Sequence, residues 1–150
     1  MKLFKMISVI LFAMFVGIQF IPTTRNESNE VLTIDFIKNF NPPEKISNLL
    51  RSSCYDCHSN NTIYPWYNKV QPISWFLEGH IREAKVELNF SEFGNYSNRK
   101  KKSKLKSITS QVKGDEMPPL SYTLIHRDAK LSEQDKFELE KWLTELRDSF

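Results

Sequence analysis

Cysteine and glycine are both scarce in this chain of 150 residues, which contains two cysteines and four glycines. Two cysteines are too few for a disulfide scaffold. A bond between Cys54 and Cys57 would close so small a loop that it would stabilise the fold very little. With only four glycines and seven prolines, the composition is neither collagen-like nor of low complexity. The two cysteines are therefore interpreted as residues with local chemistry.

Neither basic nor acidic residues are in large excess. The formal net charge is +3, and the chain without Lys2 and Lys5 contains 19 basic and 18 acidic residues. A nearly neutral body gives no reason to expect a nucleic-acid partner. Strand-like alternation of polar and apolar residues and internal repeats are lacking as well. Length and pattern together predict one all-α domain.

Residues 1–22 have the pattern of an export segment. Lys2 and Lys5 precede the apolar run 6–22, in which Ser8 and Gln19 are the clearly polar residues. No small-x-small cleavage site and no lipid-accepting cysteine follows the run. It is therefore either a cleaved signal peptide or an uncleaved membrane anchor, and its length favours the anchor. Both alternatives place the body on the periplasmic side, either held at the inner membrane by residues 6–22 or secreted after cleavage.

The rest of the chain divides into a polar segment, predicted to be a flexible tether over residues 23–30, and a domain over residues 31–150. Residues 31–40 fit a short strand or an irregular collar. Asn41, Pro42 and Glu44 have the spacing of a helix start, and that helix should run into Cys54. Further helices are predicted over three ranges, namely 73–88, 99–112 and 131–150, the last capped by Ser132 with Asp135. The ranges between them, 59–72, 89–98 and 114–123, are predicted to be loops.

Residues Cys54-Tyr55-Asp56-Cys57-His58 form a Cys-x-x-Cys-His motif. A c-type haem needs two thiols for its vinyl groups and a histidine that reaches the iron, and this motif supplies all three. A zinc site is the first alternative, with His80 or His126 as the fourth ligand, although no second close pair of ligands exists. A redox dithiol is the second, although its βαβ context is missing. We therefore predict one covalent haem c on Cys54 and Cys57, with His58 as proximal iron ligand.

Met117 is the candidate for the opposite iron ligand. The other methionines lie in the N-terminal segment, whereas Met117 sits in a polar loop stiffened by Pro118 and Pro119. Methionine is a common second ligand in electron-transfer cytochromes c. His80, His126 and an open site are the alternatives.

Two further features have open interpretations. Residues 99–106 carry six basic side chains, which form either a solvated helix face or a docking surface for an acidic partner or an anionic membrane. The aromatic residues soon after the motif belong either to the core or to the walls of a haem pocket: Trp66, Tyr67, Trp75 and Phe76.

The motif and the segments after it resemble the haem-binding domain family of exported bacterial proteins, which is common in Bacteroidota. The similar segments are CYDCHSNNT, YPWY, QPISW, His80, LNFS, EMPP and YTLIHRDAKLS, and they extend over about residues 30–148. The resemblance implies c-type haem binding by Cys54, Cys57 and His58 in a cytochrome c-like fold. It does not identify a substrate.

These features favour a monohaem protein that transfers one electron between exported redox partners over an enzyme, and they leave the question of an enzymatic activity open. A haem peroxidase or a haem-based sensor, each with an open sixth site, is the alternative.

Overall fold

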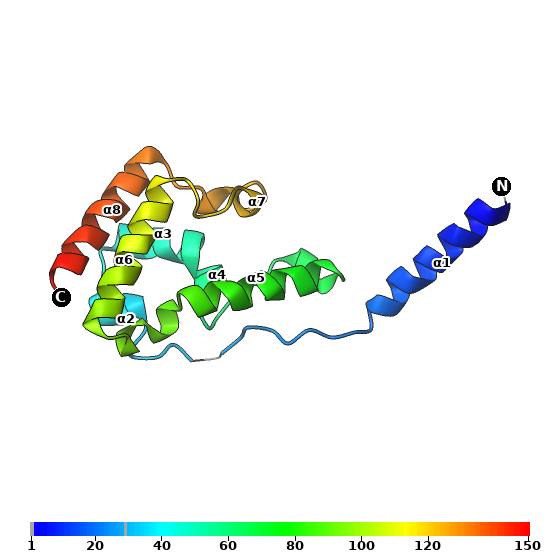
Figure 1. Cartoon of the computed structure of the whole chain (residues 1–150), viewed down its shortest axis with the longest axis horizontal. Coiled ribbons are helices and arrows are strands. Elements are labelled where there is room, and N and C mark those ends of the chain that lie inside the picture. Colours follow the sequence, from blue (N-terminus) through cyan, green and yellow to red (C-terminus); the bar gives the residue numbers. More distant parts are fainter. Residues whose placement is uncertain (1, 29) are drawn as a thin grey trace.

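The computed structural model describes residues 2–28 and 30–150, and within them the protein is helical, with no β-strand. A single antiparallel bridge joins Glu27 to Asn61. Helix α1 (Lys2–Ile18) extends away from a body in which the other helices pack together (Figure 1). The expected all-α class is confirmed.

Two long helices form one side of the body. α6 (Asn98–Lys113) and α8 (Glu133–Asp148) lie side by side in opposite directions (Figure 1). Their facing apolar stripes are buried, because side chains three and four positions apart share one helix face: Leu105, Ile108, Val112, Leu139 and Leu143. The predicted ranges 99–112 and 131–150 agree with these helices within two residues at each end, and Ser132 and Asp135 form the predicted capping box.

The helix that leads into the motif is continuous. α3 (Glu44–Leu50) passes into a π-helical turn, η1 (Arg51–Tyr55), and then into α4 (Asp56–His58). Its beginning differs from the prediction, since Asn41 does not cap it. Asn41 has a φ of 43° and ends the preceding helix, while Pro43 is the residue before α3. Asparagine tolerates the left-handed conformation, and a residue before proline avoids the helical region.

The prediction of a short strand or irregular collar over residues 31–40 is wrong for the second half of this segment, which forms the helix α2 (Phe36–Phe40). Buried Asp35 starts this helix by accepting hydrogen bonds from the backbone N–H of Ile37 and Lys38, at 3.0 and 3.3 Å. An aspartate before an apolar segment is an N-cap signal that the sequence contained.

The segment 89–98, predicted as a loop, contains the 3-10 helix η3 (Phe90–Asn95). Phe90 and Phe93 are fully buried and pack on Phe36, with ring centroids 5.1 and 4.8 Å apart. This aromatic cluster joins α2 and η3 to the α6–α8 pair through Trp142, whose ring lies 5.8 Å from that of Phe36. These phenylalanines therefore form part of the core.

The remaining elements surround the motif. α5 (Ile73–Glu87) confirms the predicted helix over 73–88 and runs from the end near α1 towards α6 (Figure 1). Short helical turns lie within or beside the predicted loops, namely η2 (Trp66–Lys69), α7 (Leu120–Thr123) and η4 (Arg127–Ala129).

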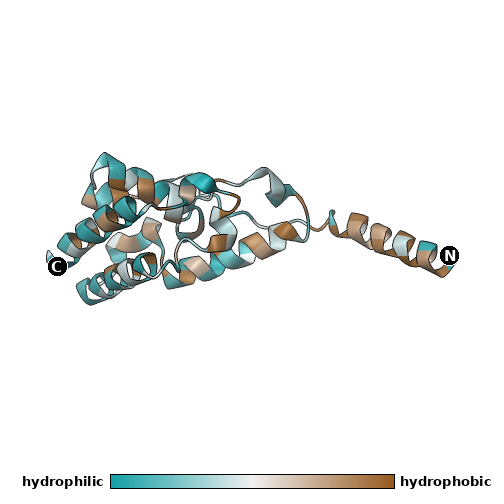
Figure 2. Cartoon of the chain, turned by 90° about the horizontal axis from the view of Figure 1, so that it is seen from above, coloured by the Kyte–Doolittle hydropathy of each residue, from teal (hydrophilic) through white to brown (hydrophobic). Residues whose placement is uncertain are grey.

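Most of the predicted export segment forms the helix α1, and Figure 2 shows α1 to be hydrophobic along most of its length. Among the helices of residues 2–28 and 30–150, none is both long and apolar enough to cross a membrane.

Residues 19–28, here called the strap, overlap the predicted tether of residues 23–30 and are hydrogen-bonded to the body at several points. The backbone N–H of Thr62 donates to the carbonyl of Asn26 at 3.0 Å, and that of Ser28 donates to the carbonyl of Asn60 at 2.9 Å. The Asn26 side-chain amide donates to the Ser59 carbonyl at 2.8 Å. The strap therefore braces the loop that directly follows His58.

Candidate functional site

Cys54, Cys57 and His58 lie on the last turns of one continuous helix. Cys54 lies within the π-helical turn η1, and Cys57 and His58 are the last two residues of α4. A π-helical turn within a helix frequently marks a functional site. Both thiols are free and half-buried. The three residues predicted to hold the haem are thus presented together by local helical structure alone.

His58 is oriented by the end of α5. Its Nδ1 lies 3.0 Å from the Ala84 carbonyl and 3.1 Å from the Leu88 carbonyl. A carbonyl only accepts hydrogen bonds, so Nδ1 carries the proton and Nε2 keeps its lone pair. The Ala84 carbonyl, in the last turn of α5, also accepts the backbone N–H of Leu88 at 2.8 Å, so both of its lone pairs have donors.

Burial lowers the pKa of His58, and Lys104 lowers it further, although the two carbonyls act in the opposite direction. The ring is therefore neutral at pH 7 with Nε2 available. A hydrogen bond from the remote ring nitrogen to a carbonyl is the usual support for a metal-bound histidine. No group within residues 2–28 and 30–150 hydrogen-bonds to Nε2.

The thiols are not activated as nucleophiles or redox groups. Burial, with a further contribution from Cys57, raises the pKa of Cys54 to about 12, and burial with Asp56 raises that of Cys57 to about 11. Catalytic dithiols have lowered pKa values, so the dithiol alternative finds no support. Within the described ranges, no three or more His, Cys, Asp or Glu side chains gather as a metal site would require.

Asp56, between the cysteines, joins the motif to two other segments. Its carboxylate accepts a hydrogen bond from the Ile63 N–H at 3.2 Å and another from the Tyr122 hydroxyl at 2.7 Å. Its backbone carbonyl accepts from the Thr62 hydroxyl at 2.6 Å. Neither Asp56 nor Tyr122 is a candidate site residue on the sequence alone. The signal available was weak, because Asp56 occupies a variable position of the motif.

His126 lies beside the motif, but its ring already has two partners, Tyr122 and Tyr67. Its ring stacks on Tyr122 with centroids 4.3 Å apart, and its Nε2 lies 2.7 Å from the Tyr67 hydroxyl. Tyr122 in turn donates to the Asp56 carboxylate, which places this stacked pair beside the motif. His80, in contrast, is exposed on α5, where its Nδ1 contacts the carbonyl of Phe76 at 2.9 Å.

Met117 precedes α7 in the segment between α6 and η4. Its backbone N–H donates to the Gln111 carbonyl at 3.2 Å, and its side chain is 38% exposed. The same segment exposes other large apolar side chains, namely Leu120, Leu124 and Ile125. Tyr122 fixes this segment to the motif through Asp56. Large apolar side chains that remain exposed next to a functional motif indicate a surface that a ligand covers.

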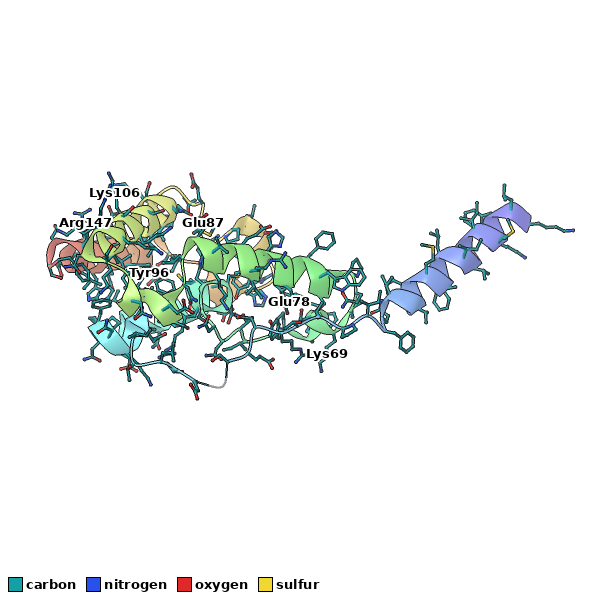
Figure 3. All side chains as sticks on the ribbon, turned by 60° about the horizontal axis from the view of Figure 1, so that its bottom comes forward. Lys69, Glu78, Glu87, Tyr96, Lys106 and Arg147 are labelled. Carbon is teal, nitrogen blue, oxygen red and sulfur yellow. The ribbon has the colours of Figure 1, made fainter. Side chains whose placement is uncertain are left out.

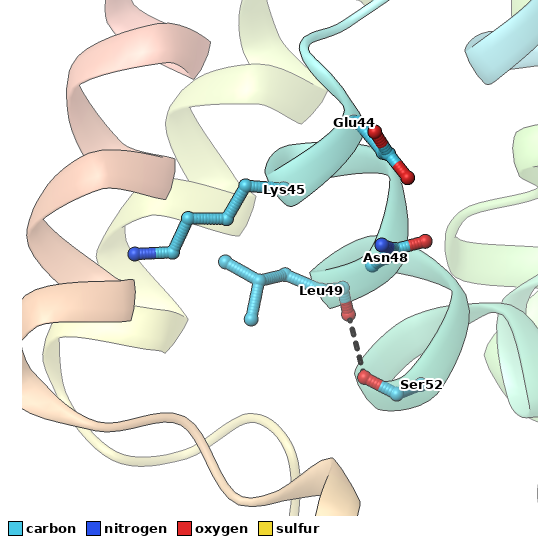
Figure 4. A pocket seen from close by; sticks show the side chains of 5 residues that line it. All are labelled: Glu44, Lys45, Asn48, Leu49 and Ser52. Carbon is cyan, nitrogen blue, oxygen red and sulfur yellow. Dashed lines mark hydrogen bonds between the residues drawn. The ribbon is translucent and has the colours of Figure 1, made fainter.

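A surface hollow elsewhere has no such features. It lies on α3 and is lined by Glu44, Lys45, Asn48, Leu49 and Ser52 (Figure 4). Lys45 extends from it to α8 and pairs with Glu138 at 2.8 Å and with Asp135 at 3.4 Å. The hollow contains none of the motif residues.

The family model for the haem-binding domain matches residues 13–145. The chain belongs to the haem-binding domain family. No curated protein and no solved structure matches it. The family match begins inside α1 and includes the strap, the motif and the Met117 segment.

The residues of this haem-binding domain fit the cofactor that the family implies. Two thiols three positions apart suit the two vinyl groups, and Nε2 of His58 suits the iron. The exposed apolar side chains around α7 suit the face of a macrocycle. One helix end thus supplies the two thiols and the imidazole that a covalent haem requires. The segment around α7, which is hydrogen-bonded to this helix end through Tyr122 and Asp56, supplies an apolar wall.

Proposed function

We propose that the protein is a c-type cytochrome that carries single electrons between redox proteins outside the cytoplasm. One haem would be joined to Cys54 and Cys57 by thioether bonds, each formed by adding a thiol S–H across a vinyl group. The observation that carries the proposal is the His58 geometry, in which Nδ1 is held by the carbonyls of α5 and Nε2 is left for iron. When bound, the haem supplies an iron that alternates between the ferric and ferrous states.

The second iron ligand in this proposal is Met117. The rivals are less well placed, because His80 is exposed on α5 and His126 Nε2 is bonded to Tyr67. A thioether ligand raises the reduction potential and closes the sixth site to small molecules. Both effects suit electron transfer better than catalysis. The Tyr122–Asp56 hydrogen bond would hold the Met117 segment against the motif.

Placement outside the cytoplasm rests on residues 1–22, whose two lysines and apolar helix α1 suit an export segment. Haem c is joined to its protein on that side of the bacterial membrane. The redox partners would be exported proteins, or domains of membrane proteins that face the same compartment.

The test is expression of the full chain in a bacterium that attaches haem c to exported proteins. Haem that stays on the polypeptide after denaturation is expected for the parent chain and not for a variant in which Ala replaces both cysteines. The oxidised protein should show the long-wavelength absorption of iron–methionine ligation, which Met117→Ala should remove and which His80→Ala and His126→Ala should retain.

Absence of covalent haem would overturn the proposal as a whole. A high-spin spectrum with ready binding of carbon monoxide or peroxide would instead favour the peroxidase or sensor function, and would overturn the assignment of Met117.

A further inference from the structure

The junction between α1 and the body is built from reciprocal hydrogen bonds. The Gln71 N–H donates to the Gln19 side-chain carbonyl at 2.9 Å, and the Gln19 amide donates back to the Gln71 backbone carbonyl at 3.1 Å. The Gln71 amide also donates to the Ile21 carbonyl at 3.2 Å. Gln71 is buried and lies between η2 and α5. Two paired bonds restrict rotation about the junction, so the direction of α1 is coupled to that of the body.

The strap continues this attachment over the next residues. The hydroxyls of Thr23 and Ser74 are 2.7 Å apart, and the Asn26 N–H donates to the Tyr64 hydroxyl at 2.6 Å. The connection between α1 and the haem motif is therefore bonded to the body at successive points. It is not a free linker.

Helix α1 itself has no protein partner. None of its described residues is buried, and its apolar side chains are exposed on every side of the helix. A helix that is hydrophobic all round is stable when an apolar medium surrounds it. Whatever medium covers α1 must also approach the part of the body to which α1 is fixed.

That part of the body exposes large apolar side chains. Phe20 is 82% exposed at the end of α1, and Trp66 and Phe76 are 78% and 68% exposed on η2 and α5. Ile73 is exposed beside Phe76 on the first turn of α5. Lys69 lies at the same end of the molecule (Figure 3). Aromatic side chains with a nearby cation are typical of protein at the level of lipid headgroups.

We propose that this end of the body, formed by Phe20, Trp66, Lys69, Ile73 and Phe76, rests on the surface of a phospholipid bilayer when α1 enters it. The inference rests on the proposed location outside the cytoplasm, and it takes the uncleaved form of the protein, in which α1 is still attached. The strap then sets the haem-binding domain in one orientation on the membrane. The start of α6, with its basic side chains, lies at the opposite end of the molecule (Figure 1) and faces water, where an acidic partner can reach it.

The experiment uses the full-length haem-loaded protein in aligned bilayers of phosphatidylethanolamine and phosphatidylglycerol. Polarised absorption in the Soret band measures the tilt of the haem plane against the bilayer. A body fixed on the membrane gives a dichroic signal. The double variant with Gln19→Ala and Gln71→Ala frees the junction, so the signal should fall severalfold while the protein stays in the membrane fraction.

A second readout does not depend on haem. Lipids brominated near the headgroup should quench the fluorescence of Trp66, and Trp66→Phe should lose the quenched fraction. The variant with Trp66→Ser and Phe76→Ser should lose dichroism, whereas Phe137→Ser, which changes an exposed phenylalanine of α8, should not.

An isotropic haem together with unquenched Trp66 would overturn the proposal and leave the proposed electron transfer intact. A full chain that stays in the soluble fraction would overturn it as well. If neither lipid nor water-soluble quenchers reach Trp66, this residue is part of the wall of the haem pocket, and the proposal is also contradicted. Missing covalent haem refutes the proposed function alone, since the fluorescence test still applies.

Discussion

The hydroxyl of Tyr122 donates a hydrogen bond of 2.7 Å to the carboxylate of Asp56, across 66 positions of sequence. One partner lies between the two cysteines and the other in the short helix α7 after Met117. The bond therefore connects the element that would hold the haem to the segment that would supply the second iron ligand. Burial and the hydrogen bond to the Asp56 carboxylate raise the pKa of Tyr122. The hydroxyl therefore keeps its proton throughout the neutral range.

Tyr122→Phe should loosen the Met117 segment without removing the ring that stacks on His126. A hydrogen bond to a charged group contributes about 1.5–3 kcal/mol, and the half-buried position of Tyr122 suggests the lower end of this range. Chemical denaturation should show the loss, and the iron–methionine band should vanish at a lower denaturant concentration than in the parent. Tyr64→Phe is the matched control, because it removes a tyrosine hydrogen bond in the strap. A Tyr122→Phe protein with unchanged stability and band would refute the role of this contact.

Cys54→Ala and Cys57→Ala should each leave a single thioether. The unreacted vinyl group then stays conjugated with the macrocycle, so the absorption of the reduced pyridine complex should shift to longer wavelength in both variants. Haem should remain covalently bound in each of them, since the other thiol and His58 are retained. Identical spectra for parent and single variants would contradict attachment at both cysteines.

Gly94→Ala should destabilise the core strongly. An added Cβ would lie 2.8 Å from both the Cβ and the carbonyl oxygen of Ile34, and the Gly94 N–H donates to that carbonyl at 2.9 Å. Overpacking of this kind costs about 1–3 kcal/mol. Gly79→Ala is the matched control, since nothing lies within 4 Å of its added Cβ. In the interior of α5 that change should stabilise by about 1 kcal/mol. Thermal unfolding should thus move in opposite directions for the two variants.

Asp135→Asn should weaken the start of α8 in a pH-dependent way. Hydrogen bonds from the Ser132 hydroxyl and N–H lower the pKa of Asp135 below its ordinary 3.8. A carboxyl with a lowered folded-state pKa contributes stability above the unfolded pKa, and loses it as pH falls through the folded one. The variant should be less stable by about 1 kcal/mol at pH 7, and the difference should shrink below pH 3.8. A difference that stays constant down to pH 2 would contradict this assignment.

Local signals predicted the long helices well, because each depends on neighbours in sequence. The apolar spacing of Leu139 and Leu143 and the cap at Ser132 specify α8 without reference to the rest of the chain. The pattern of the segment 89–98 does not reveal the 3-10 helix η3, because Phe90 and Phe93 are buried through contacts with Phe36, more than fifty positions earlier. The cap assigned to Asn41 failed because Pro43 disfavours a helical conformation at Pro42.

The sequence by itself determined the haem motif, since Cys54, Cys57 and His58 come together on one helix end whatever the rest of the chain does. Tertiary structure decided how His58 is oriented, because the carbonyls of Ala84 and Leu88 reach it from α5. It also decided that His126 is occupied by Tyr67 and that the strap is bonded to the body. These relationships join residues that are distant in sequence, so they exist only once the helices have packed together.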